Sequence, residues 1–283
     1  MYRLNRQNQK SLLSQASENE AIKARDKALE LLRDSADGLT FYPEEHRYFL
    51  GEKELVSVST IVKEYAPFDV QAAAVRASKN IKHEHYGKTP EEILSIWKEK
   101  GQAAADAGTE VHNFGEACFC IKEGHEEQME DRFRQRLADD GLEAADGKEE
   151  ALARWWDQLD LDRYVLVAKE TRIVNPEMGY AGTIDLLLYD LNEHCYVLKD
   201  YKTNADLYRW YGKMLRPPLS IIRDNDHGKY TLQQNLYRIQ LENIGINVGH
   251  MDLIWLKEDG TFEEVRLENY DKLVRYAMKT RNN

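Results

Sequence analysis

The chain has 283 residues, of which 42% are hydrophobic, and a formal net charge of −11 at pH 7. This length and apolar content suffice for a sizeable core in one large domain, and the acidic balance argues against indiscriminate coating of nucleic acid, although it is compatible with a local basic channel. No apolar run approaches the roughly 20 residues that span a bilayer. The first ten residues contain no apolar signal region, and three sparse cysteines fit buried thiols in a reducing compartment. We therefore expect a cytoplasmic protein with no membrane partner.

The first part of the chain predicts helices around one β-hairpin. Residues 1–38 are polar and charged and include a solvated helical stretch, so we expect an N-terminal helical extension there. Residues 39–62 alternate around a Gly-Glu-Lys turn, which predicts a β-hairpin. Thr89 caps a helix that starts at a proline, and Thr109 is expected to cap a second helix.

The remaining chain predicts a mixed sheet with helices on its faces. The acidic stretch 123–160 reads as a helical insertion. After it come three predicted strands, at residues 164–174, 182–190 and 195–203. A helix over 231–245 that ends at a glycine follows, and then a second hairpin and a terminal helix. This order predicts an α/β fold, a mixed central β-sheet flanked by helices. We expect a single domain over 39–283, with a helical part at about 66–160 and the core at about 108–122 and 162–283.

Two aspartates and a lysine lie in neighbouring apolar strands. Asp185 lies inside "GTIDLLL", and Asp200 and Lys202 lie in "VLKDYKT". Because side chains alternate along a strand, Asp200 and Lys202 must point to the same face. A buried carboxylate costs several kcal/mol unless it is paired or bound to a cation, and hard oxygen ligands suit Mg²⁺ or Mn²⁺ better than zinc. Taken alone, however, the D-x-K spacing favours an exposed ion pair that contributes little.

Four short motifs change this interpretation because they occur together and in one order. They are "GTEVH", "GYAGTID", "DYKT" and "QQNLY". Together they resemble the PD-(D/E)XK nuclease superfamily, specifically its RecB-like exonuclease branch. In that branch a helix with a histidine precedes a G-x-x-D strand, a D-x-K-T strand and a Q-x-x-x-Y helix. The matching positions are His112, Gly182–Asp185, Asp200–Thr203 and Gln233–Tyr237. The resemblance implies a restriction-endonuclease-like core.

The resemblance also implies a metal-dependent catalytic site. His112, Asp185 and Asp200 would be metal ligands, together with the backbone carbonyl of Tyr201. Lys202 would activate or position the attacking water. The cofactor would be one or two Mg²⁺ or Mn²⁺ ions. Some members of the branch carry an iron–sulfur cluster on four cysteines, and we expect none here, since this chain has only three cysteines.

Four further residues are candidates with an ordinary structural alternative. Gln233 and Tyr237 stand at i and i+4 on one helical face, and in this branch such a pair steadies the active site and touches the nucleic-acid backbone; the alternative is an amphipathic helix with the tyrosine in the core. Glu170, on the strand before Asp185, is an additional ligand, a water contact or a surface charge. For Glu116, one turn after the helix histidine, a helix-surface role is favoured.

Basic and aromatic residues are interleaved in the segment that follows the D-x-K-T strand. They are Arg209, Lys213, Arg216, Arg223 and Lys229, with Tyr208, Trp210, Tyr211 and Tyr230. Cations for phosphates beside aromatic faces for bases suit a single-strand channel, and long irregular connections are often functional. A solvated loop anchored by aromatics is the alternative. We expect this loop to guide DNA over the metal site, with contacts from Thr203, Gln233 and Tyr237.

The expected function is metal-dependent hydrolysis of DNA phosphodiester bonds. No P-loop motif is present, so the chain resembles a free-standing nuclease of the kind that phages encode for DNA replication, recombination or repair. We expect an exonuclease in the bacterial or phage-infected cytoplasm, with DNA and phage recombination or replication proteins as partners. The alternatives are a structure-selective endonuclease and a non-catalytic nuclease-fold protein that binds DNA or assembles other proteins. The complete set of Asp185, Asp200 and Lys202 argues against the non-catalytic alternative.

Overall fold

A mixed β-sheet forms the centre of the protein. The structure, a computed structural model, describes residues 2–4, 15–43 and 45–281. The described strands are β1 (Leu39–Tyr42), β2 (Arg47–Leu50), β3 (Lys53–Ser57), β4 (Tyr164–Asn175), β5 (Tyr180–Asp190), β6 (Cys195–Lys202), β7 (Val248–Leu256) and β8 (Phe262–Arg266). They join in the order β1-β2-β3-β5-β6-β7-β8, and β4 also pairs with β5. The pairs β3–β5 and β6–β7 are parallel and the others antiparallel.

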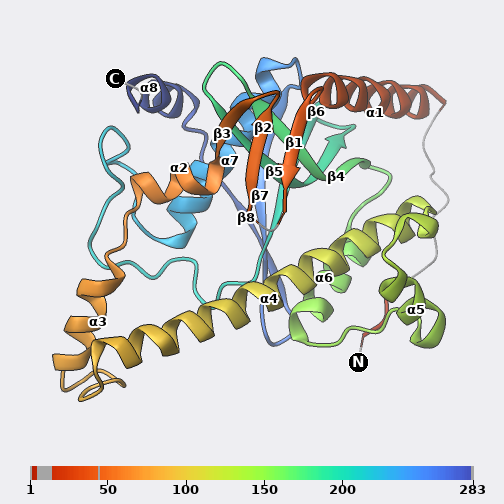
Figure 1. The fold of residues 1–283 in the computed structure, drawn as a ribbon. Helices are drawn as coiled ribbons and strands as arrows, with labels where there is room; N and C mark the ends of the chain where they lie inside the picture. The colour runs from red at the N-terminus through yellow and green to blue at the C-terminus, as the bar shows by residue number, and fades with distance from the viewer. Residues whose placement is uncertain (1, 5–14, 44, 282–283) are drawn as a thin grey trace.

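Helices cover both faces of this sheet (Figure 1). The helices are α1 (Gln15–Ser35), α2 (Val58–Tyr65), α3 (Val70–Lys79), α4 (Pro90–Glu123), α5 (Asp131–Asp140), α6 (Gly147–Gln158), α7 (Asp226–Asn243) and α8 (Asp271–Arg281), with a 3₁₀ turn at Glu126–Gln128. One large apolar cluster joins the sheet to α1, α2, α7 and α8, and a second joins it to α4, α5 and α6. The predicted α/β class, a mixed sheet flanked by helices, is therefore confirmed.

The helix that carries His112 is longer than the sequence predicts. Residues 90–123 form one continuous helix, α4, so Thr109 lies in its interior and is not the cap of a second helix. The Thr109 hydroxyl donates a hydrogen bond of 3.0 Å to the Ala105 carbonyl four residues earlier, which satisfies the hydroxyl without interrupting the helix. The predicted start is confirmed, because Thr89 and Glu92 form a reciprocal capping box with Pro90 at the first helical position.

The predicted hairpin over 39–62 is also wrong in its second half. Residues 39–57 form three antiparallel strands, and Val58 already begins α2. Ser57 caps this helix through its hydroxyl, which accepts from the Thr60 amide at 3.1 Å. The apolar residues Val58 and Ile61, at helical spacing, are fully buried. The β3–β5 pairing then attaches this small meander to the main sheet.

The other predicted elements agree with the structure within a few residues. The acidic stretch forms α5 and α6, and α7 begins at Asp226, five residues before its predicted start, because Asn225 caps it. The N-terminal helix α1 packs on the sheet, with Ala28 and Leu32 buried and a hydrogen bond of 2.8 Å from Tyr189 to Glu20. The cysteines are buried and free. Within the described residues, no helix combines the length and apolarity that a membrane span requires.

Candidate metal centre

The pairing of β5 with β6 brings the two predicted aspartates together. Leu186 pairs with Lys199 in this antiparallel ladder, so the next positions along the same register are Asp185 and Asp200. The short turn between the strands fixes this register. The Tyr201 backbone N–H donates a hydrogen bond of 2.9 Å to Asp185 Oδ2. The predicted juxtaposition of Asp185 and Asp200 therefore follows from the strands themselves.

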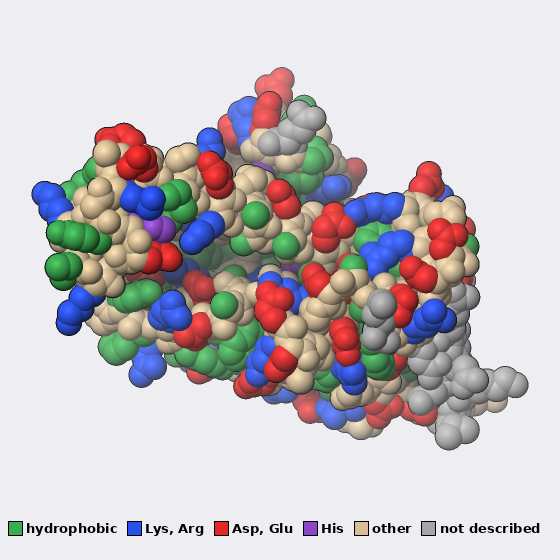
Figure 2. Space-filling view, turned by 90° about the horizontal axis from the view of Figure 1, so that it is seen from below, with side chains coloured by type: hydrophobic (Ala, Val, Ile, Leu, Met, Phe, Trp, Pro, Cys, Tyr) green, Lys and Arg blue, Asp and Glu red, His purple; other side chains and the backbone are tan. Residues whose placement is uncertain are grey.

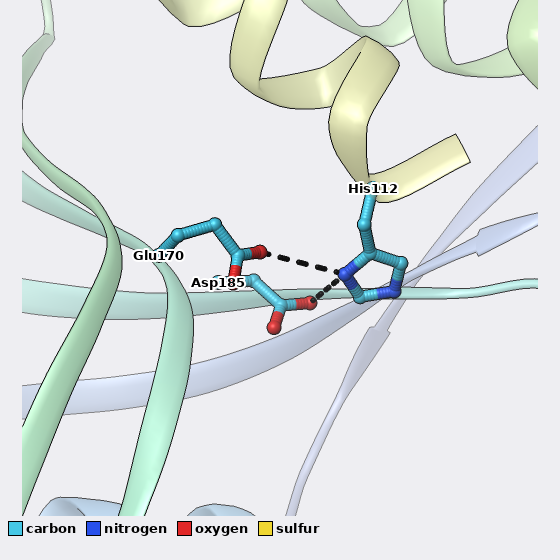
Figure 3. Close-up of side chains that lie close together, drawn as sticks. All are labelled: His112, Glu170 and Asp185. Atoms are coloured by element: carbon cyan, nitrogen blue, oxygen red, sulfur yellow. Dashed lines mark ion pairs between the residues drawn. The ribbon is translucent and has the colours of Figure 1, made fainter. Parts of the chain in front are cut away.

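Helix α4 adds a histidine to this point of the sheet. His112 Nδ1 lies 3.4 Å from Asp185 Oδ2 and 3.6 Å from Glu170 Oε1. Figure 3 shows the imidazole pointing from α4 toward the two carboxylates, which come from β4 and β5. The ligand atoms of these three residues all lie within 4.8 Å of one another, so together they could hold a metal ion. This group is called the metal cluster below.

Glu170 reaches the metal cluster through an irregularity in β4. Its backbone has φ +40°, in the left-handed region that residues other than glycine rarely adopt. The ladder pairs on either side are Lys169 with Leu186 and Thr171 with Ile184, so Glu170 lies across from Asp185. Backbone strain of this kind persists where the surroundings enforce it and concentrates at functional sites. Of the three roles open for Glu170 in the sequence, the structure supports a ligand position over a surface charge.

Asp200 lies beside the metal cluster but is not one of its members. Its carboxylate forms an ion pair with Lys202 and accepts a hydrogen bond of 2.9 Å from Gln234 Nε2. Lys202 Nζ also lies 4.6 Å from the centre of the Tyr230 ring. The prediction that Asp200 and Lys202 point to the same face is therefore confirmed, whereas the orientation of the Asp200 carboxylate is set by Lys202 and Gln234. For Tyr201, the backbone contact that the structure gives is its N–H, not the carbonyl.

The charges around the metal cluster shift one another strongly. Burial and the neighbouring Asp185 raise the pKa of Asp200 to about 6. Burial alone would lower the pKa of His112, but Asp185 and Glu170 outweigh it and raise that pKa to about 9. Likewise, burial disfavours the Lys202 ammonium, and Asp200 and Asp185 more than compensate, so the pKa of Lys202 is raised. The concentrated negative charge thus favours positive charge at this point, whether a proton or a metal ion carries it.

The Q-x-x-x-Y pair forms behind this centre. Gln233 Nε2 donates a hydrogen bond of 3.3 Å to the Tyr237 hydroxyl, as the i, i+4 spacing predicts. Tyr237 is buried, and its ring lies against Gly182, where an added Cβ would come within 2.6 Å of Cε1. The glycine of the G-x-x-D motif is therefore required by close packing of α7 on β5. Tyr237 belongs to the core, and the side-chain hydrogen bond of Gln233 goes to this tyrosine.

Sequence reasoning missed Gln234, which is fully buried and contacts Asp200 directly. A usable signal was its spacing, because Tyr230, Gln234 and Tyr237 lie at i, i+4 and i+7 and so share one face of α7. Glu116 lines the cavity described below and forms an ion pair of 2.6 Å with Lys169. It is therefore neither a member of the metal cluster nor an isolated surface charge.

A second group of possible ligand atoms lies at the far end of β5. It consists of Asp190, Glu193 and His250. Arg163 already donates to Asp190 at 3.0 Å and contacts Glu193 at 3.2 Å, so a guanidinium supplies the compensating charge. Asp190 Oδ1 also accepts backbone N–H groups. We assign no metal to this group. A variant of it therefore serves below as a control for metal binding at the metal cluster.

Two cavities lie close to each other near the metal cluster, and two of the cluster's residues line the first of them. The first, of about 790 Å³, is lined by His112, Glu170, Lys202 and Thr203 and is called the central cavity. The second, of about 630 Å³, is called the side groove. Its charged and aromatic lining consists of Phe68, Arg76, Asp206, Arg209, Tyr211, Lys213, Asp224, Asp226 and Lys229. Asn204 and Ala205 line both. Figure 2 shows a hollow on this side of the molecule, with positive and negative side chains interspersed around it.

The loop after β6 meets the sequence expectation in part. Residues 203–225 contain no helix or strand, as predicted, and Arg209 and Lys213 line the side groove. Trp210 instead packs within the loop, donating to the Lys213 carbonyl and lying under the Arg223 guanidinium at 5.0 Å. Arg216 is exposed and lines neither cavity. The predicted DNA contacts of Trp210 and Arg216 therefore lack support from the cavity geometry.

A scan against protein-family models and a search of curated proteins both found no match to this chain.

Proposed function

We propose that the protein is a metal-dependent deoxyribonuclease of the PD-(D/E)XK superfamily, in its RecB-like branch. The observation that carries this proposal is the metal cluster, because three residues from α4, β4 and β5 converge beside the Asp200–Lys202 pair. Two of them, His112 and Asp185, belong to motifs that resemble the superfamily. A metal site needs these side chains close together in space, and the motifs alone do not ensure that.

The donor set fits a hard divalent cation. Two carboxylates and one imidazole can bind Mg²⁺ or Mn²⁺ and leave positions free for substrate oxygens and water. The carboxylates lie close together and partly buried, which a divalent charge would stabilise. Residues His112, Glu170 and Asp185 would hold one ion, and Asp200 lies close enough to contribute if its carboxylate turned away from Lys202. When bound, the ion would supply a Lewis acid next to the scissile phosphate.

The protein's own groups account for the rest of the chemistry. Lys202 carries a buried ammonium fixed by Asp200 and the Tyr230 ring, so it can orient the attacking water and offset charge that develops on the phosphoryl oxygens. Gln234 holds Asp200 in place, and Gln233 and Tyr237 keep α7 against β5. In this proposal they position the reacting groups and do not themselves react.

The side groove supports nucleic acid as the substrate. Arg76, Arg209, Lys213 and Lys229 present cations along it, and the exposed rings of Phe68 and Tyr211 provide stacking surfaces. Cations beside exposed rings suit a strand of nucleic acid, and the groove adjoins the central cavity at Asn204, which lines both. Three aspartates also line the groove: Asp206 pairs with Arg209, and Asp224 and Asp226 pair with Lys229. The four cations outnumber these carboxylates by one, a slight positive balance on a chain whose overall charge is −11.

Action from DNA ends, in phage-type replication, recombination or repair, rests on the resemblance to the RecB-like branch. The test uses linear end-labelled and circular DNA, each single- and double-stranded, with Mg²⁺, Mn²⁺ or EDTA. We expect digestion of the linear substrates only, only with metal, and not by Asp185→Asn. Nicked circles would identify a structure-selective endonuclease. Binding without cutting would identify a non-catalytic DNA-binding protein and refute the nuclease proposal.

A further inference from the structure

The lining of the central cavity includes a cation that belongs to none of the four motifs. Lys148, in the first turn of α6, lines the central cavity together with the metal-cluster residues. Among the described lining residues, Lys148 and Lys202 are its only lysines or arginines. Lys202 is buried against Asp200, so Lys148 is the one with a mobile counter-ion.

The counter-ion of Lys148 is Glu258, in the turn between β7 and β8. The two side chains form an ion pair of 2.7 Å, and the Lys148 side chain is 18% exposed whereas that of Glu258 is 78% exposed. An ion pair with one partner in open solvent contributes little to stability. A phosphate entering the cavity can therefore displace the Glu258 carboxylate at small cost.

The backbone around this pair is fixed tightly. An added Cβ at Gly147 would lie 1.9 Å from the Glu258 carbonyl oxygen, so the turn rests directly on the start of α6. At the other side of the turn, Gly260 has φ +80° and an added Cβ would lie 3.1 Å from the Glu150 carboxyl carbon. The position of Lys148 is therefore preset by close packing, while the Glu258 side chain remains free to move.

We propose that Lys148 forms a binding site for a backbone phosphate of the nucleic acid, and that Glu258 occupies it in the free protein. This inference rests on the proposed function and deepens it. Asn204 lines both the side groove and the central cavity, and Lys148 lines the central cavity alone. In this proposal the strand passes from the groove over Asn204 and the metal cluster to Lys148. Lys148 would then be a positioning residue, not a catalytic one.

The test measures binding of a fluorescent single-stranded oligonucleotide in EDTA, at salt concentrations from 50 to 200 mM. The plot of log K against log salt has a negative slope, and loss of one phosphate contact should make that slope shallower by about 0.7. Wild-type affinity should thus fall about 2.6-fold more than that of Lys148→Ala over this range. Glu258→Gln should bind about threefold more tightly than wild type, because the competing carboxylate is gone. The matched control is Lys257→Ala in the same turn, whose lysine pairs with Glu263 and does not line the cavity.

The outcomes separate this inference from the proposed function. An unchanged salt slope in Lys148→Ala, or weaker binding by Glu258→Gln, overturns the phosphate site even if the wild type digests DNA with Mg²⁺. A wild type that binds but does not cut refutes the nuclease proposal and leaves the Lys148 measurement fully readable. A wild type that binds no oligonucleotide in EDTA overturns the phosphate site, and one that also cuts no DNA with Mg²⁺ or Mn²⁺ overturns both. Thermal unfolding of each variant verifies that it is folded.

Discussion

Gly182→Ala should destabilise the protein by about 2 kcal/mol. The added methyl would lie 2.6 Å from Tyr237 Cε1 and 3.2 Å from its hydroxyl, whereas carbon atoms pack best at about 3.5–4.0 Å. The ring is buried and held by Gln233, so α7 or β5 must move. Overpacking of this kind costs about 1–3 kcal/mol, against a gain of about 0.5–1 kcal/mol from replacing a strand glycine. Because the contact is very short, we take a cost of about 3 kcal/mol. Subtracting a gain of about 1 kcal/mol leaves a net loss of about 2 kcal/mol.

The assay is thermal or urea unfolding in EDTA, where metal binding plays no part. A loss of about 2 kcal/mol corresponds to a Tm lower by about 4–8 °C. Gly101→Ala is the matched control, because it lies inside α4 with no atom within 4 Å of an added Cβ, and should gain about 1 kcal/mol. Combining Gly182→Ala with Tyr237→Leu should cost less than the sum of the two single changes. Wild-type stability in Gly182→Ala would refute the packing argument.

Three further changes test other parts of the account. Asp252→Asn should cost about 2 kcal/mol at pH 7, because it breaks a buried pair with Lys199, which keeps its second partner Glu264. Burial alone would raise the pKa of Asp252, but His250 and Lys199 lower it. The difference from wild type in urea unfolding should therefore shrink as the pH falls below about 4, and a constant difference would contradict this. Arg209→Ala with Lys213→Ala should weaken oligonucleotide binding and reduce its salt slope by up to about 1.4, and an equal slope in titrations would remove the side groove from binding. Lys202→Ala should keep metal-dependent stabilisation in thermal melts but lose DNA cleavage, and normal cleavage would exclude it from the chemistry.

Local patterns were enough to predict most of the fold. Alternation and short turns placed β4, β5 and β6 within a few residues, and the register followed from the short β5–β6 turn. The errors arose where a single residue has two common uses. Thr109 could cap a helix or lie inside one, and Ser57 could continue a strand or begin a helix; in both cases tertiary packing of the neighbouring apolar residues decided the outcome.

The metal cluster was only partly predictable from the sequence. His112 and Asp185 came from motifs, whereas Glu170 remained one candidate with three possible roles until the β4–β5 register placed it across from Asp185. Gln234 was overlooked because the neighbouring Gln233 matched the motif. Lys148 comes from α6, outside every motif, and reaches the central cavity only through the packing of the β7–β8 turn on that helix.

The central claim is that His112, Glu170 and Asp185 hold one divalent cation. Its most direct test is Mn²⁺ titration followed by electron paramagnetic resonance, with the wild type compared to Glu170→Gln and to Glu193→Gln from the group at the far end of β5. We expect a bound ion in the wild type, weaker binding in Glu170→Gln, and wild-type binding in Glu193→Gln. Equal Mn²⁺ affinity in the wild type and Glu170→Gln, or a loss confined to Glu193→Gln, would contradict it.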